Sequence, residues 1–421
     1  MEDKEQIQQN RDSGKGLFAG GIIVGMSLML MLVMVTYLGT KVARIVQMQN
    51  GKLAPVSFAE NSIVDAEMVQ KLQELESTVN RYFYLEKVTD EEMRDGIYKG
   101  MLKALNDPYT EYYTAEELNS LLNQTEGIYY GIGAYVQLDK ITSLPQISGV
   151  IEGTPAQEAG LRANDLIYEV DGESTYGLTL TEAVALIKGE EGTQVVLTIA
   201  REDEKDYLTI PVTRRKVESP TVKYEMLEDN MAYIQITEFD DVTIDQFADA
   251  LATMKGSGME GLILDVRGNP GGSLTSVVEI CRMLLPEGRI VYTEDKNGKQ
   301  VEYSCDGKRE LQVPLVVLVD MNSASASEIL AGAIQDYGIG TLVGTTTFGK
   351  GIVQQLIPLL DGSAVKITVS SYFTPKGRNI HGVGIVPDVE CKFDGEAYYD
   401  TDNPVDNQLE KAKQVLGDLM K

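Results

Sequence analysis

The feature that most constrains the fold is a pair of short, almost continuously apolar runs, "GLILDVRGN" at 261–269 and "VPLVVLVD" at 313–320. Runs of this kind are typical of strands that are buried on both faces. Each is followed by a segment with helical character, at 274–285 and 325–336. Buried strands that alternate with helices predict a parallel sheet covered by helices. We therefore expect an α/β fold from about residue 222 onward.

A second constraint lies near the start, where residues 17–39 carry no charge. At about 1.5 Å per residue, a helix over this segment is long enough to cross a hydrocarbon core of about 30 Å. A cleaved signal peptide has a shorter apolar core and a small-residue cleavage site, and "TYLGTKVARI" offers no convincing site. We predict a retained transmembrane anchor. Three basic residues flank it on each side, so charge alone leaves its orientation open.

The remaining segments complete a multidomain α+β and α/β organisation. Apolar residues spaced by three and four predict helices after the anchor, whereas the short alternating runs after residue 126 predict a small mixed module of strands and helices. The predicted boundaries are a tail at 1–16, the anchor at 17–39, a linker at 40–62, a helical region at 63–125, the small module at 126–213, the α/β core at 214–395 and a C-terminal helix at 396–421.

Composition excludes several classes of function. The formal net charge of −27 repels nucleic acid and anionic lipid, so neither is an expected partner. The three cysteines are far apart, and His381 is the only histidine, so the usual zinc ligands cannot be assembled and no metal or other cofactor is expected. The cysteines are interpreted as small buried residues. A histidine-based catalytic triad is improbable in a chain with one histidine.

Residues 344–351, "GTTTFGKG", match a phosphate-binding loop at Gly344, Gly349 and Lys350, but Gly351 replaces the required Ser or Thr. A helix is also required after the lysine, and the β-branched segment that follows is poor for one. Nucleotide binding is therefore disfavoured. Two interpretations of Lys350 remain at this point, a solvated loop charge and a desolvated amine that serves as a base.

The second interpretation needs a nucleophile, and "MNSASASEIL" supplies three serines directly after a buried strand. A hydroxyl at a strand-to-helix turn lies beside the backbone N–H groups of a helix N-terminus, which stabilise an oxyanion. A neutral lysine can replace histidine as the base if burial lowers its pKa. The glycine-rich "DVRGNPGGSL" at 265–274 would add further N–H groups. The simpler interpretations are an N-cap serine and a tight turn.

Taken together, the motifs resemble those of the carboxyl-terminal processing proteases, tail-specific serine peptidases with an inserted PDZ domain. The resemblance runs from about residue 64 onward. The matching motifs are, in order, "DPYTEYYT", "YYGIGAYV", "GTPAQEAGLRANDLIYEVDG", "DVRGNPGGSL", "NSASASEILAGAIQDY", "GTTTFGKGIVQQ" and "GRNIHGVGIVPDV".

The resemblance implies a serine endopeptidase with a crotonase-like α/β core and a Ser-Lys dyad. It assigns Ser325 as the nucleophile, Lys350 as the base and Gln354 as its support. It places the oxyanion donors at the amides of Ala326 and Gly271. His381 falls in a family segment without a catalytic histidine and is interpreted as structural.

The small module at 126–213 resembles a PDZ domain, which binds the C-terminus of a peptide and gates the active site in this family. The implied carboxylate-binding loop comprises Tyr130, Gly131, Ile132, Gly133 and Ala134. Expected partners are proteins with unstructured C-terminal tails, and a second copy of the chain through the N- and C-terminal helices.

The family acts outside the cytoplasm, which implies a single-pass bacterial membrane protein with the N-terminus inside and the catalytic part outside. The alternative functions are a membrane-tethered PDZ adaptor with a non-catalytic α/β scaffold, and nucleotide binding at 344–350. The intact Ser325, Lys350 and Gln354 argue against the adaptor.

Overall fold

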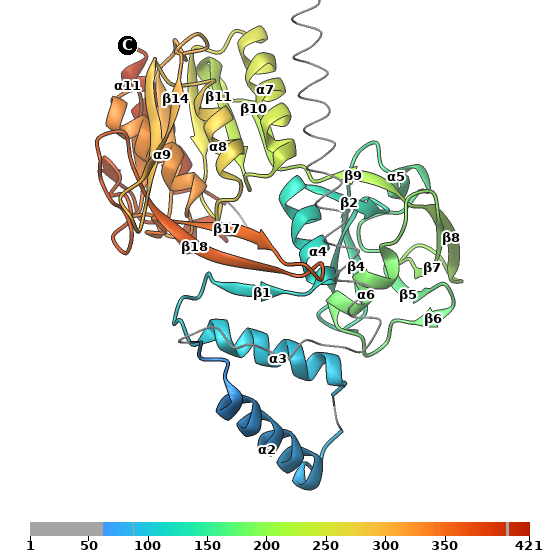
Figure 1. Ribbon diagram of the computed structural model, residues 1–421. Coiled ribbons are helices and arrows are strands. Elements are labelled where there is room, and N and C mark those ends of the chain that lie inside the picture. Colours follow the sequence, from blue (N-terminus) through green and yellow to red (C-terminus); the bar gives the residue numbers. More distant parts are fainter. Residues whose placement is uncertain (1–61, 87, 401–403) are drawn as a thin grey trace, which may run out of the picture. The chain divides into compact units, whose positions relative to one another are not determined.

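The computed structural model describes residues 62–86, 88–400 and 404–421 (Figure 1). The predicted anchor at 17–39 lies outside these residues and stays a prediction. None of the helices in the described ranges is long and apolar enough to cross a bilayer. The chain divides into two units, 1–89 and 90–421. The described part of the first unit contains one helix, α2 (Ala66–Tyr82), whose N-cap is Asp65.

The core of the second unit is a six-stranded sheet in the order β10-β11-β12-β15-β16-β19. The strand β10 is antiparallel to β11, and all other neighbours are parallel. The bounds are β10 (Val222–Met226), β11 (Met231–Ile236), β12 (Gly261–Asp265), β15 (Leu315–Val319), β16 (Thr341–Gly344) and β19 (Val389–Glu390). Every residue of β12 and β15 is buried, which confirms the α/β prediction made from these two apolar runs.

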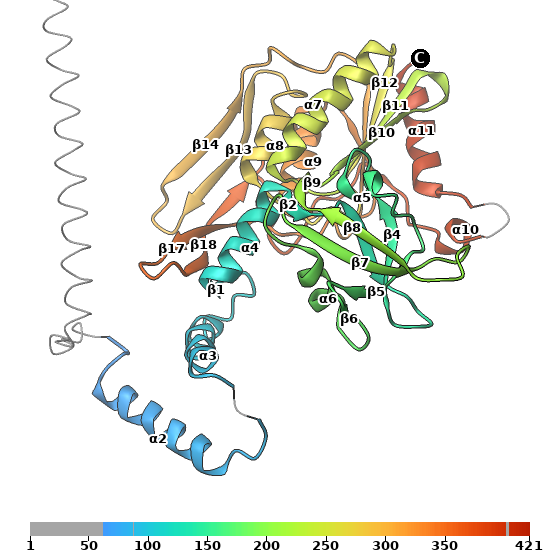
Figure 2. The same ribbon diagram turned by 90° about the vertical axis from the view of Figure 1, so that its right-hand side faces the viewer.

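Helices cover both faces of this sheet (Figure 2). Side chains alternate across a strand, so neighbouring residues of β12 enter different clusters, Leu262 and Leu264 on one face and Ile263 on the other. The first face is covered by α7, α8 and α9, and the second by the C-terminal helix α11 through Ala412 and Leu416. Their bounds are α7 (Asp241–Gly256), α8 (Leu274–Cys281), α9 (Ala326–Tyr337) and α11 (Asn407–Leu419); the short α10 (Gly395–Tyr398) precedes α11.

A second, antiparallel sheet brings an early segment of the chain to the core. Its order is β1-β18-β13-β14, and β17 also pairs with β18. The strand β1 lies between α3 and α4, yet it pairs with β18 through Tyr112 and Val365. The bounds are α3 (Asp90–Lys103), β1 (Glu111–Tyr113), α4 (Ala115–Glu126), β13 (Gly288–Asp295), β14 (Gln300–Cys305), β17 (Ile352–Pro358) and β18 (Ala364–Phe373).

The small module forms its own sheet in the order β3-β4-β5-β7-β8, with β6 paired to β5. Its buried cluster, including Ile147, Ile167 and Leu197, is separate from the core clusters. The entering strand β2 pairs with the leaving strand β9, so both connections run side by side. The bounds are β2 (Ile128–Gly131), β3 (Ala134–Leu138), β4 (Pro145–Val150), α5 (Pro155–Glu158), β5 (Leu166–Val170), β6 (Glu173–Ser174), α6 (Leu180–Ile187), β7 (Gln194–Ala200), β8 (Leu208–Thr213) and β9 (Arg215–Glu218).

Candidate active site

Ser325 lies at the turn between β15 and α9, where it is the N-cap residue with φ 53° and ψ −110°. A non-glycine residue in such a sparsely populated conformation costs about 1–3 kcal/mol and persists only where its surroundings hold it. The Tyr372 hydroxyl donates to the Ser325 carbonyl at 3.0 Å, and the Ser325 N–H donates to Glu328 Oε2 at 2.9 Å. The backbone of the serine is therefore fixed before any substrate binds.

The Glu328 carboxylate joins the serine turn to the lysine loop. It is fully buried in the first turn of α9. Besides the Ser325 amide, it accepts hydrogen bonds from the Thr347 hydroxyl at 2.6 Å, the Gly349 N–H at 2.7 Å and the Lys350 N–H at 2.8 Å. Glu328 is not among the residues predicted from the sequence. Its signal was the capping-box spacing, a serine followed three residues later by a glutamate.

The glycines of 344–351 serve close packing of the backbone. Gly344 has φ 136°, and a Cβ there would lie 1.9 Å from the Val319 carbonyl oxygen. A Cβ on Gly351 would lie 2.6 Å from the His381 backbone nitrogen. The segment after Lys350 is strand β17, so no helix N-terminus follows the loop to bind phosphate. The nucleotide-binding alternative is therefore wrong.

The Lys350 side chain is half-buried, with its Nζ 4.4 Å from the centroid of the Tyr109 ring. Burial lowers the pKa of this amine, and the nearby charge of Lys366 lowers it further; the Asp107 and Glu328 carboxylates oppose both effects. The direction is the one expected for a desolvated base. The burial of Lys350 was predicted from the sequence, whereas the nearby Lys366 was not.

The Gln354 side chain contacts the neighbouring strand. Gln354 in β17 is the register partner of Thr368 in β18, and its Nε2 donates to the Thr368 hydroxyl at 3.1 Å. No hydrogen bond links Ser325 Oγ to Lys350 Nζ in the described structure. The ammonium instead lies over Tyr109.

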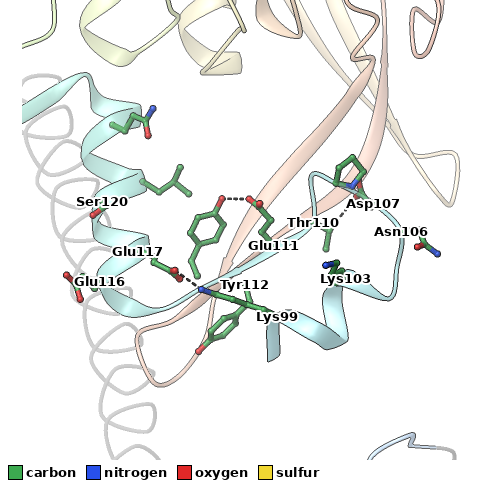
Figure 3. A pocket seen from close by; sticks show the side chains of 14 residues that line it. Lys99, Lys103, Asn106, Asp107, Thr110, Glu111, Tyr112, Glu116, Glu117 and Ser120 are labelled. Carbon is green, nitrogen blue, oxygen red and sulfur yellow. Dashed lines mark hydrogen bonds and ion pairs between the residues drawn. The ribbon is translucent and has the colours of Figure 1, made fainter. Parts of the chain in front are cut away.

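One cavity of about 440 Å³ contains the predicted catalytic side chains. Ser325, Ala326, Lys350 and Gln354 all line it, together with Lys366. A larger cavity of about 950 Å³ lies beside it, between α3, β1 and α4 (Figure 3). Leu121 and Gln124 of α4 line both cavities, so this helix forms part of the wall between them.

The two predicted oxyanion donors, the N–H groups of Ala326 and Gly271, differ in their hydrogen bonding in this conformation. Ala326 is the first residue of α9, where an N–H has no acceptor within the helix, and it lines the cavity. Gly271 approaches the serine closely, since a Cβ on it would lie 2.8 Å from Ser325 Cβ. Its N–H, however, donates to the Asn269 side-chain oxygen at 2.8 Å. The role of Gly271 stays a prediction that requires this bond to be shared or released.

The predicted peptide-binding loop lies beside a groove in the small module. A cavity of about 340 Å³ is lined by α6 and by four of the five predicted residues, namely Gly131, Ile132, Gly133 and Ala134. The carbonyls of Ile132 and Gly133 accept hydrogen bonds from the Ala156 and Ile151 amides, which hold the loop in place. The fifth residue, Tyr130, lies in β2 and lines a neighbouring cavity.

Metal-binding side chains do not gather anywhere in the described ranges, since no group of three or more His, Cys, Asp and Glu side chains could hold an ion. Cys281 and Cys305 are buried free thiols, as predicted, and Cys391 is intermediate. His381 is exposed, and its Nδ1 accepts a hydrogen bond from the Gly351 N–H at 3.4 Å. The structural role of His381 stays a prediction.

Family models match three regions of the chain. The family model described as peptidase family S41 matches residues 230–391, the PDZ domain matches 146–201, and the N-terminal domain of the activating protease CtpB matches 29–117.

Named relatives agree with these matches. A carboxyl-terminal-processing protease of Synechocystis sp. is 36% identical over 75% of this chain and 75% of its own length. The carboxy-terminal processing protease CtpA of Bacillus subtilis is 37% identical over 76% of this chain and 69% of its own. A solved photosystem II D1 C-terminal processing protease is 30% identical, covering 84% of this chain and 98% of that one, with a TM-score of 0.47.

The sheet covered by helices, the serine turn and the inserted module define a serine peptidase with a PDZ domain. The chain belongs to peptidase family S41, among the carboxyl-terminal processing proteases.

Proposed function

We propose that this protease is a membrane-anchored endopeptidase that cleaves protein tails with Ser325 as nucleophile and Lys350 as general base. The observation that carries the proposal is the Glu328 carboxylate, which accepts hydrogen bonds from the Ser325 and Lys350 amides at once. This single buried group fixes the backbones of both residues at one cavity. The half-buried amine, with its lowered pKa, supports the role of base.

The chemistry uses the side chains of that cavity. Neutral Lys350 takes the Ser325 hydroxyl proton while the serine oxygen attacks the peptide carbonyl carbon. The oxyanion of the tetrahedral intermediate accepts a hydrogen bond from the Ala326 N–H. The ammonium returns its proton to the leaving amine as the C–N bond breaks. Water, deprotonated by the same amine, then attacks the acyl-enzyme, and the proton passes back to the Ser325 oxygen.

Substitution of each partner tests the dyad. Ser325→Ala and Lys350→Ala should each abolish cleavage of an unstructured protein tail without lowering the melting temperature appreciably. Ser257→Ala and Lys255→Ala are matched controls, because both residues are exposed at the C-terminal end of α7. Cleavage retained by either active-site variant would contradict the assignment.

Tail recognition belongs to the groove of the PDZ domain. The loop at 131–134 would bind the terminal carboxylate through its amides, while the peptide pairs with β3 as an added strand. Val184 and Ile187 of α6 line the groove and favour an apolar terminal side chain. Val184→Asp should weaken binding of a tail peptide that ends in an apolar residue, measured by fluorescence anisotropy, whereas turnover of a short ester substrate should persist.

The location follows from the segment at 17–39, which we propose anchors the chain with its catalytic part outside the cytoplasm. The uncharged length of the segment supports this placement. Membrane fractionation of the full chain, with protease treatment of intact cells, tests both anchoring and orientation. We also propose self-association as a homodimer, which light scattering of the detergent-solubilised protein would measure.

A further inference from the structure

A chain of three side chains leads from the α3–β1 loop to the catalytic glutamine. The Thr368 hydroxyl donates to Asp107 Oδ2 at 2.6 Å, and the same hydroxyl oxygen accepts from Gln354 Nε2 at 3.1 Å. Asp107 lies in the loop before β1, whereas Thr368 and Gln354 lie on paired positions of β18 and β17. The three residues therefore come from three separate segments.

The direction of these hydrogen bonds is set at the Asp107 end. Burial alone would raise the pKa of this carboxyl, but hydrogen bonds from the hydroxyls of Thr368 and Thr110 hold it below its usual range. An ionised carboxylate only accepts hydrogen bonds, so the Thr368 proton must point to Asp107. The Thr368 oxygen can then only accept from the amide. Gln354 must present its N–H₂ to Thr368, which leaves Oε1 as the atom free to face the cavity.

The orientation matters because Gln354 and Lys350 line the same cavity. An amide oxygen accepts a hydrogen bond from a lysine amine. An amide N–H₂ is itself a donor, so it would face the N–H groups of the amine and no hydrogen bond would form between them. A reversed glutamine would therefore repel the base that it is expected to hold.

We propose that Asp107 and Thr368 are positioning residues for the Ser-Lys reaction, since their polarised hydrogen bonds fix the Gln354 amide so that its oxygen faces Lys350. The inference rests on the proposed function of Lys350 and Gln354. The loop that carries Asp107 is held to the core independently, because Thr368 N–H donates to the Thr110 hydroxyl at 3.2 Å and β1 pairs with β18. A displacement of this loop would act on the base through Gln354, in addition to the direct contact that Tyr109 of the same loop makes with Lys350.

The test uses two substitutions that break the chain in different ways. Thr368→Val keeps the shape but removes the hydroxyl. Asp107→Asn keeps the hydroxyl but admits a carboxamide that can donate to it, which permits the reversed direction. Each should lower kcat about tenfold, because the base is misoriented. KM should change little, because the contacts that bind the substrate are kept. In Thr368→Val the acid limb of the kcat/KM profile should move to lower pH, because the Lys350 ammonium loses an acceptor while the Asp107, Glu328 and Lys366 charges stay in place. In Asp107→Asn the limb should move the same way, but there the lost carboxylate charge adds to the effect, so the shift in Thr368→Val is the one that decides.

Two controls separate this role from a structural one. Thr368→Ser should restore both kcat and the pH profile. Asp361→Asn removes a carboxylate that accepts from the Ser363 hydroxyl at 2.6 Å in the turn between β17 and β18, and it should leave both unchanged. The double variant Thr368→Val/Gln354→Ala should be no slower than Gln354→Ala alone if Thr368 acts through the glutamine.

Three results would overturn the inference: wild-type kinetics in Thr368→Val, a lower kcat with an unmoved acid limb, or additive losses in the double variant. Failure of the proposed function has a different signature. In that case the wild-type protein itself would show no cleavage that depends on Ser325, whereas failure of the inference alone leaves wild-type cleavage intact.

Discussion

The proposed nucleophile and the proposed base of this protease are held in different ways. The Ser325 turn is fixed through its backbone, by the Glu328 carboxylate and the Tyr372 hydroxyl. The backbone of Lys350 is fixed by the same carboxylate, but its side chain rests on Tyr109 from the α3–β1 loop. The backbone conformation of Ser325 is thus fixed by hydrogen bonds. The position of the Lys350 amine depends instead on a side chain from the α3–β1 loop, which is distant in the sequence. The comparison predicts that changes on the two sides will have different kinetic signatures.

The largest expected effect comes from the group that both sides share. Glu328→Gln replaces one acceptor oxygen by an N–H₂ group in a site where four donors converge. At least one buried donor would lose its partner, at a cost of about 1–3 kcal/mol, and both backbones would shift. We expect kcat to fall about 100-fold, measured with a tail-peptide substrate.

The matched control for Glu328 is Asp336→Asn at the other end of α9. That carboxylate is also buried, and it accepts from the Lys376 N–H at 2.8 Å and pairs with Arg378. Its loss should lower the melting temperature while kcat stays within about twofold. Equal losses of kcat in both variants would mean that Glu328 acts only through general stability.

The second prediction concerns only the segment 344–351, which carries Lys350. Gly344→Ala would place a Cβ 1.9 Å from the Val319 carbonyl oxygen at a residue with φ 136°. The clash is with backbone, which cannot move aside cheaply, so we expect a loss of about 3 kcal/mol in the free energy of unfolding. Urea unfolding followed by circular dichroism measures it. Gly298→Ala is the control, because that turn glycine also has positive φ but open space around it.

The parallel sheet and the turn around Ser325 could be predicted from the sequence more completely than the surroundings of Lys350. The runs at 261–269 and 313–320 predicted buried strands because burial on both faces leaves a local, continuous apolar pattern. Ser325 could be predicted as a nucleophile because its hydroxyl follows a buried strand at the start of a helix. Lys350 could be predicted as a base because a desolvated amine can replace histidine. The structure places both in one cavity.

The remaining contacts depend on residues far apart in the chain. The strand β1 has three residues, too few for a readable alternation, and its partner lies more than 200 positions away. Asp107 and Thr368 meet only because of that pairing. The second lysine that lines the cavity, Lys366, lies in strand β18, which also contains Thr368. None of these contacts has a local signature, since each depends on how the two sheets are assembled.

The third prediction tests the electrostatic control of the base. The Lys366 ammonium donates to the Tyr113 hydroxyl at 2.8 Å and lies 3.2 Å from a Glu111 carboxylate oxygen. Its charge lowers the pKa of Lys350. Lys366→Met removes that charge, so the pKa of Lys350 should rise and the acid limb of kcat/KM should move to higher pH. Lys366→Arg, which keeps the charge, should leave the limb near its wild-type position.

The smallest expected effect lies at Tyr109, and it tests whether the amine depends on the α3–β1 loop. An ammonium over an aromatic ring gains about 0.5–1 kcal/mol at a partly exposed site. Tyr109→Leu removes this stabilisation of the protonated form, so the pKa of Lys350 should fall and the acid limb should move to lower pH. Tyr109→Phe keeps the ring and should behave as wild type. A limb that moves upward, opposite to this sign, would show that the ring acts on Lys350 mainly by excluding water, and the base would then depend on burial alone.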